Sequence, residues 1–282
     1  MAELSVSAES WPIRGSFRIS RGAKTSADTL RVELRQGGFQ GRGECVPYAR
    51  YGESLDSVTG QIESVRLDSR NGMDRLQLQQ QLPPGAARNA LDGEFWDLQA
   101  KMSRQGVCEL LAVPRMQALT TAYTLSLDSP ANMHRAALEH ADRPLLKLKL
   151  AGEGDIERVR AVRQGAPAAR LIVDANEAWD VGSYRAMLPE WMQLGVELIE
   201  QPLPAAQDQA LRSLDRPIPI CADESCHASG SLPRIVDRYD MVNIKLDKAG
   251  GLTEALQLRK AAEAGGLQIM VGSMLATSLA MA

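Results

Sequence analysis

The chain has 282 residues, 44% of them hydrophobic and 24% charged, with a formal net charge of −3. These values are typical of a soluble globular protein with a large core, and the length fits one barrel plus a smaller domain. The slight negative charge and the lack of a basic run argue against a nucleic-acid-binding surface. No apolar run is long enough to span a membrane.

The cysteines and the N-terminus favour a cytoplasmic protein. The chain has four cysteines, Cys45, Cys108, Cys221 and Cys226. Their spacing is not that of a zinc site, and free thiols are typical of cytosolic proteins. The first ten residues lack a basic region followed by an apolar core, so no signal peptide is predicted.

Residues 1–115 are predicted to form an α+β domain. Segments within residues 1–48 that are rich in Thr, Val and Ile, with glycine turns, indicate strands. Residues 14–27 are either a mobile loop that closes over a site or a hairpin connection, and local composition favours the hairpin. Apolar residues at helical spacing then predict helices, at 53–67, 73–81 and 86–105.

Several charged side chains are expected to be structural. Asp92, Glu94 and Asp97 lie on the helix at 86–105, where a solvated or capping role is expected rather than catalysis. His134 and His140 fall in a predicted surface helix.

Residues 116–282 alternate between strands and helices, as a (β/α) barrel does. Seven strands are predicted, from TTAYTLSL at 120–127 to LQIMVGS at 267–273. A closed barrel has eight strands, so either the chain is truncated before the eighth strand or the barrel closes by other means. The edge strand would then keep unpaired backbone groups.

Five of these strands are short apolar runs that end in a charged residue. Successive separations of 25, 26, 23 and 22 residues connect Lys149, Asp174, Glu200, Asp223 and Lys245. Each separation has the length of one strand plus one crossover helix. Because the carboxyl ends of barrel strands share one face, we expect these five side chains to converge there.

The three acids predict a metal site. Clustered carboxylates repel one another unless a cation lies between them, and Mg²⁺ commonly takes a few carboxylates together with water and substrate oxygens. Asp174, Glu200 and Asp223 are therefore the expected Mg²⁺ ligands, with one ion per chain. Glu224 and Asp247 are expected just outside this set, beside the lysines and the metal.

Lysines are predicted on both sides of the acids. Lys147 and Lys149 are two residues apart on one strand, so both point into the barrel mouth. The positive charge of Lys147 disfavours the charged form of Lys149, which can then act as a base. Lys245 occupies the equivalent place on a strand beyond the acids, and Lys248 is expected to be solvated or to lie behind the site.

Two lysines across a metal-bound carboxylate suit removal of a proton from the adjacent carbon. The metal stabilises the enediolate, one lysine takes the proton from one face, and the other returns a proton to the opposite face. Inversion at that carbon would follow. Thr124 and Ser273, at strand ends, either contact the substrate or are an ordinary strand and turn residue.

The same motifs resemble the enolase superfamily. LLKLKL, LIVDANEAW, ELIEQPLP, ICADESCH and VNIKLDKAGGLTEAL occur in the order and spacing of the muconate-lactonizing-type subgroup. WPIRGSFRISRGAK, GECVPYARYGES and LPPGAARNALDGEFWDL extend the resemblance over nearly the whole chain, and it is strongest to dipeptide epimerases. The resemblance implies an α/β fold, an enolase-type modified TIM barrel with an α+β capping domain at 1–115 and the barrel at 116–282.

The resemblance also implies roles. Lys149 and Lys245 match the acid/base residues, and Asp174, Glu200 and Asp223 match the Mg²⁺ ligands. Lys147 matches a lysine that contacts the substrate carboxylate and depresses the proton affinity of its neighbour. Thr124 and Ser273 match substrate-contacting positions, with Asn176 behind the site. The implied substrates are dipeptides of the L-Ala-D/L-Glu type from peptidoglycan recycling. The sequence leaves open whether the protein forms a homo-oligomer.

Two departures from the family pattern concern the substrate. Lys24 stands where a family member has an arginine that reads the glutamyl side chain, and lysine keeps the charge without the bidentate geometry. The Asp-x-Asp of the eighth strand, which holds the dipeptide ammonium in the family, lies beyond the end of this chain.

Other functions fit parts of the same pattern. The metal and lysines would also serve a cycloisomerase, an o-succinylbenzoate synthase or an N-acylamino acid racemase. A truncated chain could instead be an inactive fragment or a binding module. A Schiff-base lysine enzyme fits a barrel, but it leaves the three acids unexplained.

Overall fold

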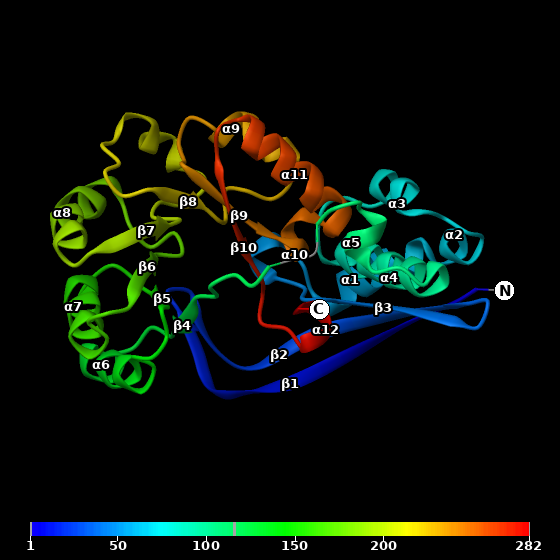
Figure 1. Cartoon of the computed structure of the whole chain (residues 1–282), viewed down its shortest axis with the longest axis horizontal. Coiled ribbons are helices and arrows are strands. Elements are labelled where there is room, and N and C mark those ends of the chain that lie inside the picture. The colour runs from blue at the N-terminus through cyan, green and yellow to red at the C-terminus, as the bar shows by residue number, and fades with distance from the viewer. Residues whose placement is uncertain (1, 115–116, 282) are drawn as a thin grey trace.

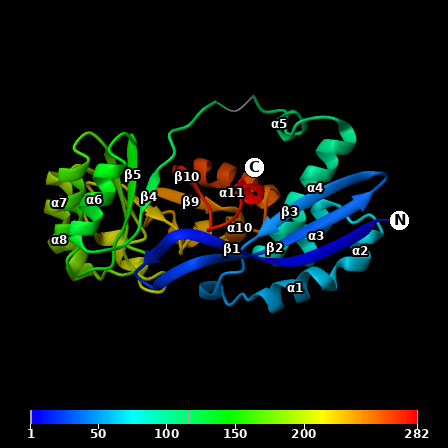
Figure 2. The ribbon, with the colours of Figure 1, turned by 90° about the horizontal axis from the view of Figure 1, so that it is seen from below.

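The computed structural model describes residues 2–114 and 117–281, and it begins with a three-stranded antiparallel sheet. The strands are β1 (Glu3–Ile19), β2 (Gly22–Gln36) and β3 (Phe39–Cys45). Strands β1 and β2 form a long hairpin that pairs up to Ile19 and Gly22, so the hairpin predicted within residues 14–27 is confirmed. The hairpin reaches from the N-terminal helices to the region of β4 and β5 (Figure 2).

Helices follow this sheet in the chain, and several of them pack against it. They are η1 (Ala49–Tyr51), α1 (Leu55–Ser64), α2 (Arg66–Arg70), α3 (Arg75–Gln81), α4 (Ala86–Ser103) and α5 (Val107–Leu110). Helix α4 packs closely on β3 because that strand has Gly41 and Gly43, where a Cβ atom would collide with the backbone of α4. The buried side of α4 includes Leu91, Phe95 and Leu98, as its apolar spacing predicts.

The rest of the chain forms a parallel sheet that curves into an incomplete barrel (Figure 1). Its strands lie in the order β10-β9-β8-β7-β6-β5-β4. They are β4 (Tyr123–Leu125), β5 (Leu145–Lys149), β6 (Arg170–Asp174), β7 (Val196–Glu200), β8 (Ile220–Ala222), β9 (Met241–Lys245) and β10 (Gln268–Gly272). The prediction of seven barrel strands is therefore confirmed.

Helices follow the strands on the outside of this sheet (Figure 1). They are α6 (Pro130–Glu139), α7 (Asp155–Gly165), α8 (Val181–Gln193), η2 (Asp208–Ser213), η3 (Ser229–Ser231), α9 (Leu232–Ile235), α10 (Leu246–Ala249) and α11 (Leu252–Ala264). The last helix, α12 (Ser278–Met281), lies instead against β3 of the N-terminal sheet. None of the helices in residues 2–114 and 117–281 has the length and apolar character needed to cross a bilayer.

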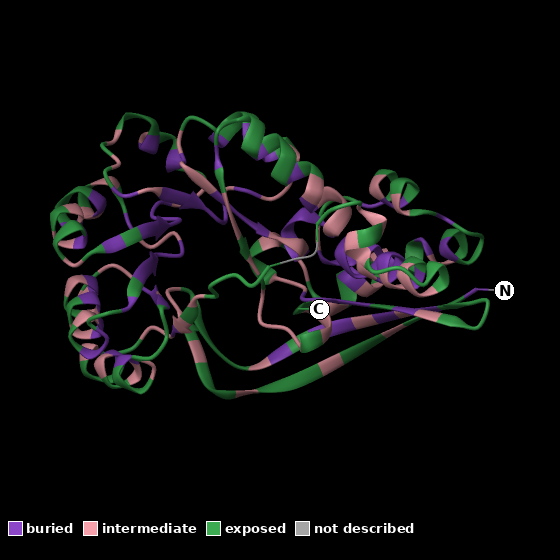
Figure 3. Cartoon of the chain, in the orientation of Figure 1, coloured by how far each residue is buried: buried purple, intermediate pink, exposed green. Residues whose placement is uncertain are grey.

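Alternation along the strands separates two apolar regions. Residues such as Leu148, Val173 and Ile199 point outward into the main core beneath the helices. Leu145, Ile172, Leu198 and Cys221 instead form a small cluster. Because side chains alternate along a strand, this cluster lies on the face that also carries the charged strand ends. Figure 3 shows the central strands buried, whereas the far part of the β1–β2 hairpin is exposed.

Helix α4 joins the N-terminal sheet to the barrel. Arg88 donates hydrogen bonds to the carbonyls of Ala249 (2.7 Å) and Gly250 (3.1 Å), and the carboxylate of Asp92 accepts one from Thr253 N (2.9 Å) in the first turn of α11. Asp92 is therefore a capping residue, but for a helix distant in sequence. The predicted boundary between residues 115 and 116 lies outside the described residues.

The expectation of a solvated or capping role is wrong for Glu94. Its side chain is fully buried, and neither carboxylate oxygen has a hydrogen-bond partner among the described residues. Burial, with a smaller contribution from Asp97, raises the pKa of Glu94 well above its ordinary value. Asp97 does follow the expectation, since it is partly exposed and accepts hydrogen bonds from Arg42 N and Lys101.

We predict that Glu94→Met raises the thermal unfolding midpoint more at pH 8 than at pH 5. The pKa of Glu94 is higher in the folded than in the unfolded state. The free energy of unfolding of the wild type therefore falls as the pH rises from the ordinary carboxyl pKa to the folded-state pKa of Glu94. Relief of an unpaired buried polar group contributes roughly 1–3 kcal/mol. The midpoints are measured by circular dichroism, with Gln99→Met as an exposed control on the same helix. A midpoint difference independent of pH would contradict the prediction.

Candidate active site

The charged strand ends meet at one point of the barrel, as their spacing predicts. Asp174 and Glu200 are the last residues of β6 and β7, and Asp223 directly follows β8. One oxygen atom from each of the three carboxylates lies within 4.8 Å of the other two, and all three residues are buried. The strand pairing Lys149↔Asp174↔Glu200 places neighbouring charges at the same level of the sheet.

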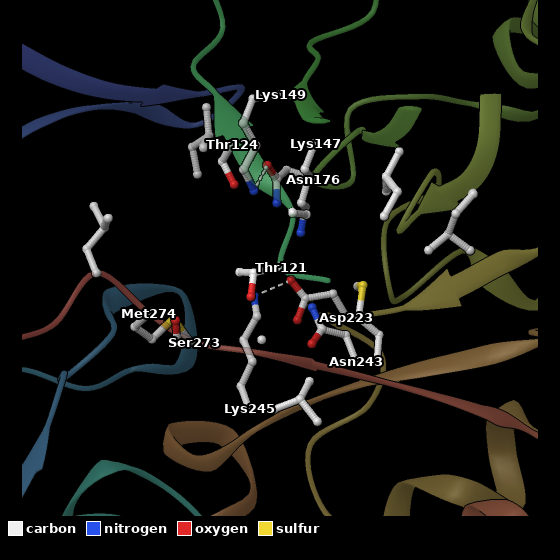
Figure 4. A pocket seen from close by; sticks show the side chains of 18 of the residues that line it. Thr121, Thr124, Lys147, Lys149, Asn176, Asp223, Asn243, Lys245, Ser273 and Met274 are labelled. Carbon is white, nitrogen blue, oxygen red and sulfur yellow. Dashed lines mark hydrogen bonds and ion pairs between the residues drawn. The ribbon is translucent and has the colours of Figure 1, made fainter. Parts of the chain in front are cut away.

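Lysines approach the acids from both sides. Figure 4 shows Lys245 beside Asp223, with Lys147 and Lys149 on another strand. The ammonium groups of Lys149 and Lys147 lie 2.6 Å and 3.0 Å from Asp174 Oδ2, and Lys147 also contacts Glu200. Lys245, on β9, pairs with Asp223 Oδ2 at 2.5 Å. Since β5 and β9 are separated by the three strands that carry the acids, Lys149 and Lys245 flank the cluster on opposite sides.

The surroundings give these lysines different proton affinities. Burial lowers the pKa of Lys149, Asp174 opposes this effect, and repulsion from Lys147 adds to it, so that the pKa lies below its ordinary value. Burial also disfavours the charged forms of Lys147 and Lys245, but the adjacent carboxylates outweigh it and raise both pKa values. The site therefore offers an amine that loses its proton readily and, across the acids, an ammonium that keeps its proton.

The three carboxylates have the character of a ligand set for a hard cation. Burial raises the pKa of each, but Lys147 and Lys149 bring the pKa of Asp174 down to about 2, and Lys245 and Lys248 hold that of Asp223 well below its ordinary value. Glu200 differs, since burial and Asp174 raise its pKa. Its buried Oε2 contacts the Lys147 ammonium. Three close carboxylate oxygens suit a divalent cation such as Mg²⁺.

Asn243 is a site residue that the sequence reasoning missed. It lies two residues before Lys245 on β9, and its Nδ2 donates to Glu200 Oε1 (2.8 Å). A Cβ atom at Gly272, on β10, would lie 2.6 Å from the Asn243 Oδ1 atom, so the absence of a side chain there makes room for the amide. The strand alternation that places Lys245 inside the barrel could have revealed Asn243, because residues two apart share a face.

The two residues Asp247 and Lys248, which follow β9, compare differently with the expectation. Lys248 lies behind the site, which is one of the two expected alternatives. It is buried, and its ammonium donates to Asp223 Oδ1 (2.6 Å) and to Asn243 O (3.0 Å). Asp247 does not lie beside the lysines, because its carboxylate accepts hydrogen bonds from Val46 N and Asn89 Nδ2 of the N-terminal part. The turn into α10 directs successive side chains to different sides, which places Asp247 away from the acids.

Two other residues behind the acids are connected to Lys149. Its ammonium donates to Asn176 Oδ1 (3.1 Å), and Asn176 Nδ2 donates to Glu224 Oε1 (3.2 Å). Burial and the charges of Asp223 and Asp174 raise the pKa of Glu224 to about 7. Arg21, at the tip of the β1–β2 hairpin, pairs with Glu224 at 2.7 Å, and the sequence reasoning did not identify it.

A cavity of about 1140 Å³ opens beside these groups. Its lining includes the predicted substrate-contacting residues Lys24, Thr124 and Ser273, together with Lys147, Lys149, Asp223 and Lys245. Lys24 lies on β2, and its ammonium is 5.5 Å from the centre of the Tyr48 ring. The hairpin thus brings one exposed cation toward a pocket whose inner end carries the acids and lysines.

Two family models match the chain. Residues 1–112 match the N-terminal domain of mandelate racemase and muconate lactonizing enzyme, and residues 132–282 match the enolase C-terminal domain-like model. The L-Ala-D/L-Glu epimerase of Escherichia coli strain K12 is 46% identical, over 99% of this chain and 88% of that protein.

Solved structures agree with these matches. An enolase family member from Agrobacterium tumefaciens with homology to dipeptide epimerases, solved with sodium and L-Ala-L-Glu, has a TM-score of 0.98 and 49% identity, covering 100% of this chain and 86% of that one. A dipeptide epimerase from Methylococcus capsulatus, complexed with Mg and L-Arg-D-Lys, has a TM-score of 0.92 and 30% identity, covering 99% and 84%. The chain therefore belongs to the mandelate racemase and muconate lactonizing enzyme family of the enolase superfamily.

Proposed function

We propose that the protein is a Mg²⁺-dependent isomerase that epimerises dipeptides of the L-Ala-D/L-Glu type at the α-carbon of their C-terminal residue. The observation that carries this proposal is the position of Lys149 and Lys245 on opposite sides of three buried carboxylates. Inversion of a carbon needs one group to remove a proton from one face and another to deliver a proton to the opposite face. Similarity to an L-Ala-D/L-Glu epimerase and to a structure that holds L-Ala-L-Glu supports the substrate class.

In this proposal Asp174, Glu200 and Asp223 hold the Mg²⁺ ion. Their oxygen atoms are close enough to share one ion, and a relative was crystallised with Mg. The bound ion supplies positive charge that stabilises the enediolate form of the substrate carboxylate. Asn243 and Lys248 fix the orientation of Glu200 and Asp223 through hydrogen bonds to one oxygen of each.

The lysines of this chain move the proton. Lys149, whose pKa is lowered, takes the α-proton in one direction of the reaction, and Lys245, whose pKa is raised, donates a proton from the other side. Their roles exchange in the reverse direction. Lys147 lies between Asp174 and Glu200, where its ammonium binds the substrate carboxylate and disfavours the charged form of Lys149.

The two domains have different roles in this proposal. Residues 1–115 form the capping domain, whose hairpin brings Lys24 to the cavity so that it can attract an acidic side chain. Residues 116–282 form the barrel domain, which holds the metal ligands and the lysines and presents Thr124 and Ser273 to the substrate. Lysine is a point charge without the fork of arginine, so we expect a weaker preference for glutamyl over other C-terminal residues.

We place this activity in the cytoplasm, in peptidoglycan recycling of the cell wall. Dipeptides of alanine and glutamate suit that role. The four cysteines are all free thiols, three of them buried, which is typical of proteins from a reducing compartment.

The first prediction for this function is deuterium uptake. In D₂O with Mg²⁺, L-Ala-L-Glu should gain one deuterium at the α-carbon of glutamate and form the L,D epimer, because proton removal and return both involve solvent-exchanging amines. NMR follows both changes. If no dipeptide of a panel with acidic, basic and apolar C-terminal residues exchanges, while N-acetylglutamate does, N-acylamino acid racemisation becomes the better assignment.

The two lysines should be separable by substitution. Lys149→Ala and Lys245→Ala should each lower epimerisation by roughly 10²–10⁴-fold, the usual contribution of a general acid or base. Each variant should still exchange the α-proton of one epimer, and the two variants should retain opposite epimers. Loss of exchange from both epimers in both variants, with the fold retained by circular dichroism, would exclude the two-sided arrangement.

The acids should bind the metal. In the wild type, Mg²⁺ should raise the unfolding midpoint in a concentration-dependent way, because a ligand that binds only the folded state stabilises it. Glu200→Gln should weaken this response at least about tenfold in Mg²⁺ concentration, since it removes one charged oxygen ligand. Asp56→Asn, an exposed acid on α1, is the matched control. An unchanged response in Glu200→Gln would place the ion elsewhere.

A further inference from the structure

The tip of the β1–β2 hairpin is fixed to the barrel by Arg21. This residue lies in the two-residue turn between Ile19 and Gly22. Its guanidinium donates to Glu224 Oε1 (2.7 Å), to the carbonyl of Asn176 (2.7 Å) and to Glu177 Oε2 (3.2 Å). Ser20 adds a hydrogen bond to the same Asn176 carbonyl at 3.2 Å. One arginine therefore joins two loops, one after β6 and one after β8.

The contacts of Arg21 continue to Lys149 through two buried side chains. Glu224 Oε1 accepts hydrogen bonds from both Arg21 and Asn176 Nδ2, and Asn176 Oδ1 accepts one from the Lys149 ammonium. Asn176 and Glu224 are each 4% exposed, so water does not readily replace these partners. The chemistry of the groups orients the amide, because lysine only donates here and a carboxylate only accepts.

The loop that carries Asn176 also depends on outside contacts. Asn176 and Glu177 have φ angles of 46° and 70°, in the left-handed region that side chains other than glycine, asparagine and aspartate rarely adopt. Such conformations persist where the surrounding structure holds them. Here the Asn176 amide N–H donates to Asp174 Oδ1, and Arg21 binds the Asn176 carbonyl from the other side.

We propose that Arg21 is a positioning residue, which couples docking of the hairpin to the orientation of the Lys149 amine through Glu224 and Asn176. The proposal rests on the function proposed above. When the hairpin is docked, Arg21 fixes Glu224, Glu224 fixes the Asn176 amide, and the amide oxygen directs one N–H of Lys149 away from the substrate carbon. Among the described residues Lys245 has no part in this chain of contacts, since its ion pair is with Asp223.

Arg50 offers a matched comparison. It comes from the same N-terminal part and binds Glu177 with two hydrogen bonds, of 2.9 Å and 2.8 Å. It therefore anchors the same loop with the same kind of side chain. Its hydrogen bonds go to Glu177, and among the described residues none goes to Glu224 or Asn176. Substitution of Arg50 therefore weakens the attachment of this loop without touching the contacts that lead to Lys149.

The test compares α-proton exchange from each epimer of Ala-Glu in D₂O. Lys149→Ala first identifies the epimer that Lys149 deprotonates. Arg21→Gln should then lower kcat for exchange from that epimer by roughly 10–100-fold, the scale expected for a misplaced catalytic group. Exchange from the other epimer should change less than about threefold. Arg50→Gln should affect both epimers by the same factor, and Arg21→Lys should restore part of the loss.

Equal losses from both epimers in Arg21→Gln would overturn the proposal, because Arg21 would then act only by docking the hairpin. Unchanged exchange from both would overturn it as well. Absence of exchange in the wild type would instead count against the proposed function. In that case a crystal structure of Arg21→Gln decides, since we expect the Asn176 amide to leave Lys149, and retention of the 3.1 Å contact would refute the coupling.

Discussion

The arrangement of the barrel mouth depends on the repulsion among three buried carboxylates. Asp174, Glu200 and Asp223 are almost inaccessible to water, so their charges cannot be screened by solvent and must be offset by cations held nearby. The chain supplies these cations from both flanks, as Lys147 and Lys149 on one side and Lys245 and Lys248 on the other. The same requirement that stabilises the acids thus places amines on both faces of the space between them.

Much of this site could be predicted from the sequence because it follows from a regular period. Separations of 22 to 26 residues match one strand plus one crossover connection, which brings the ends of parallel strands to the same edge of a sheet. The alternation Leu146, Lys147, Leu148, Lys149 likewise revealed which side chains face the interior. The site residues that strand spacing and alternation place at the barrel mouth could therefore be predicted.

The residues that were missed or misjudged depend on contacts between distant segments. Nothing near Arg21 in the sequence indicates that Glu224, about two hundred positions later, accepts its hydrogen bond. Glu94 resembles a surface acid of an amphipathic helix, but the packing of α4 against the rest of the chain buries it. Asp247 turns toward Asn89 for the same reason, since the docked N-terminal helix provides partners that local pattern cannot show.

The fit between Gly272 and Asn243 has a consequence for Glu200. The space that a methyl group would fill on β10 is taken by an amide that reaches across from β9. The two positions therefore share one volume. A larger residue at 272 requires the Asn243 side chain to move or to be shortened, and the carboxylate of Glu200 then loses this donor. The absence of a side chain at 272 thus helps to hold Glu200 in place.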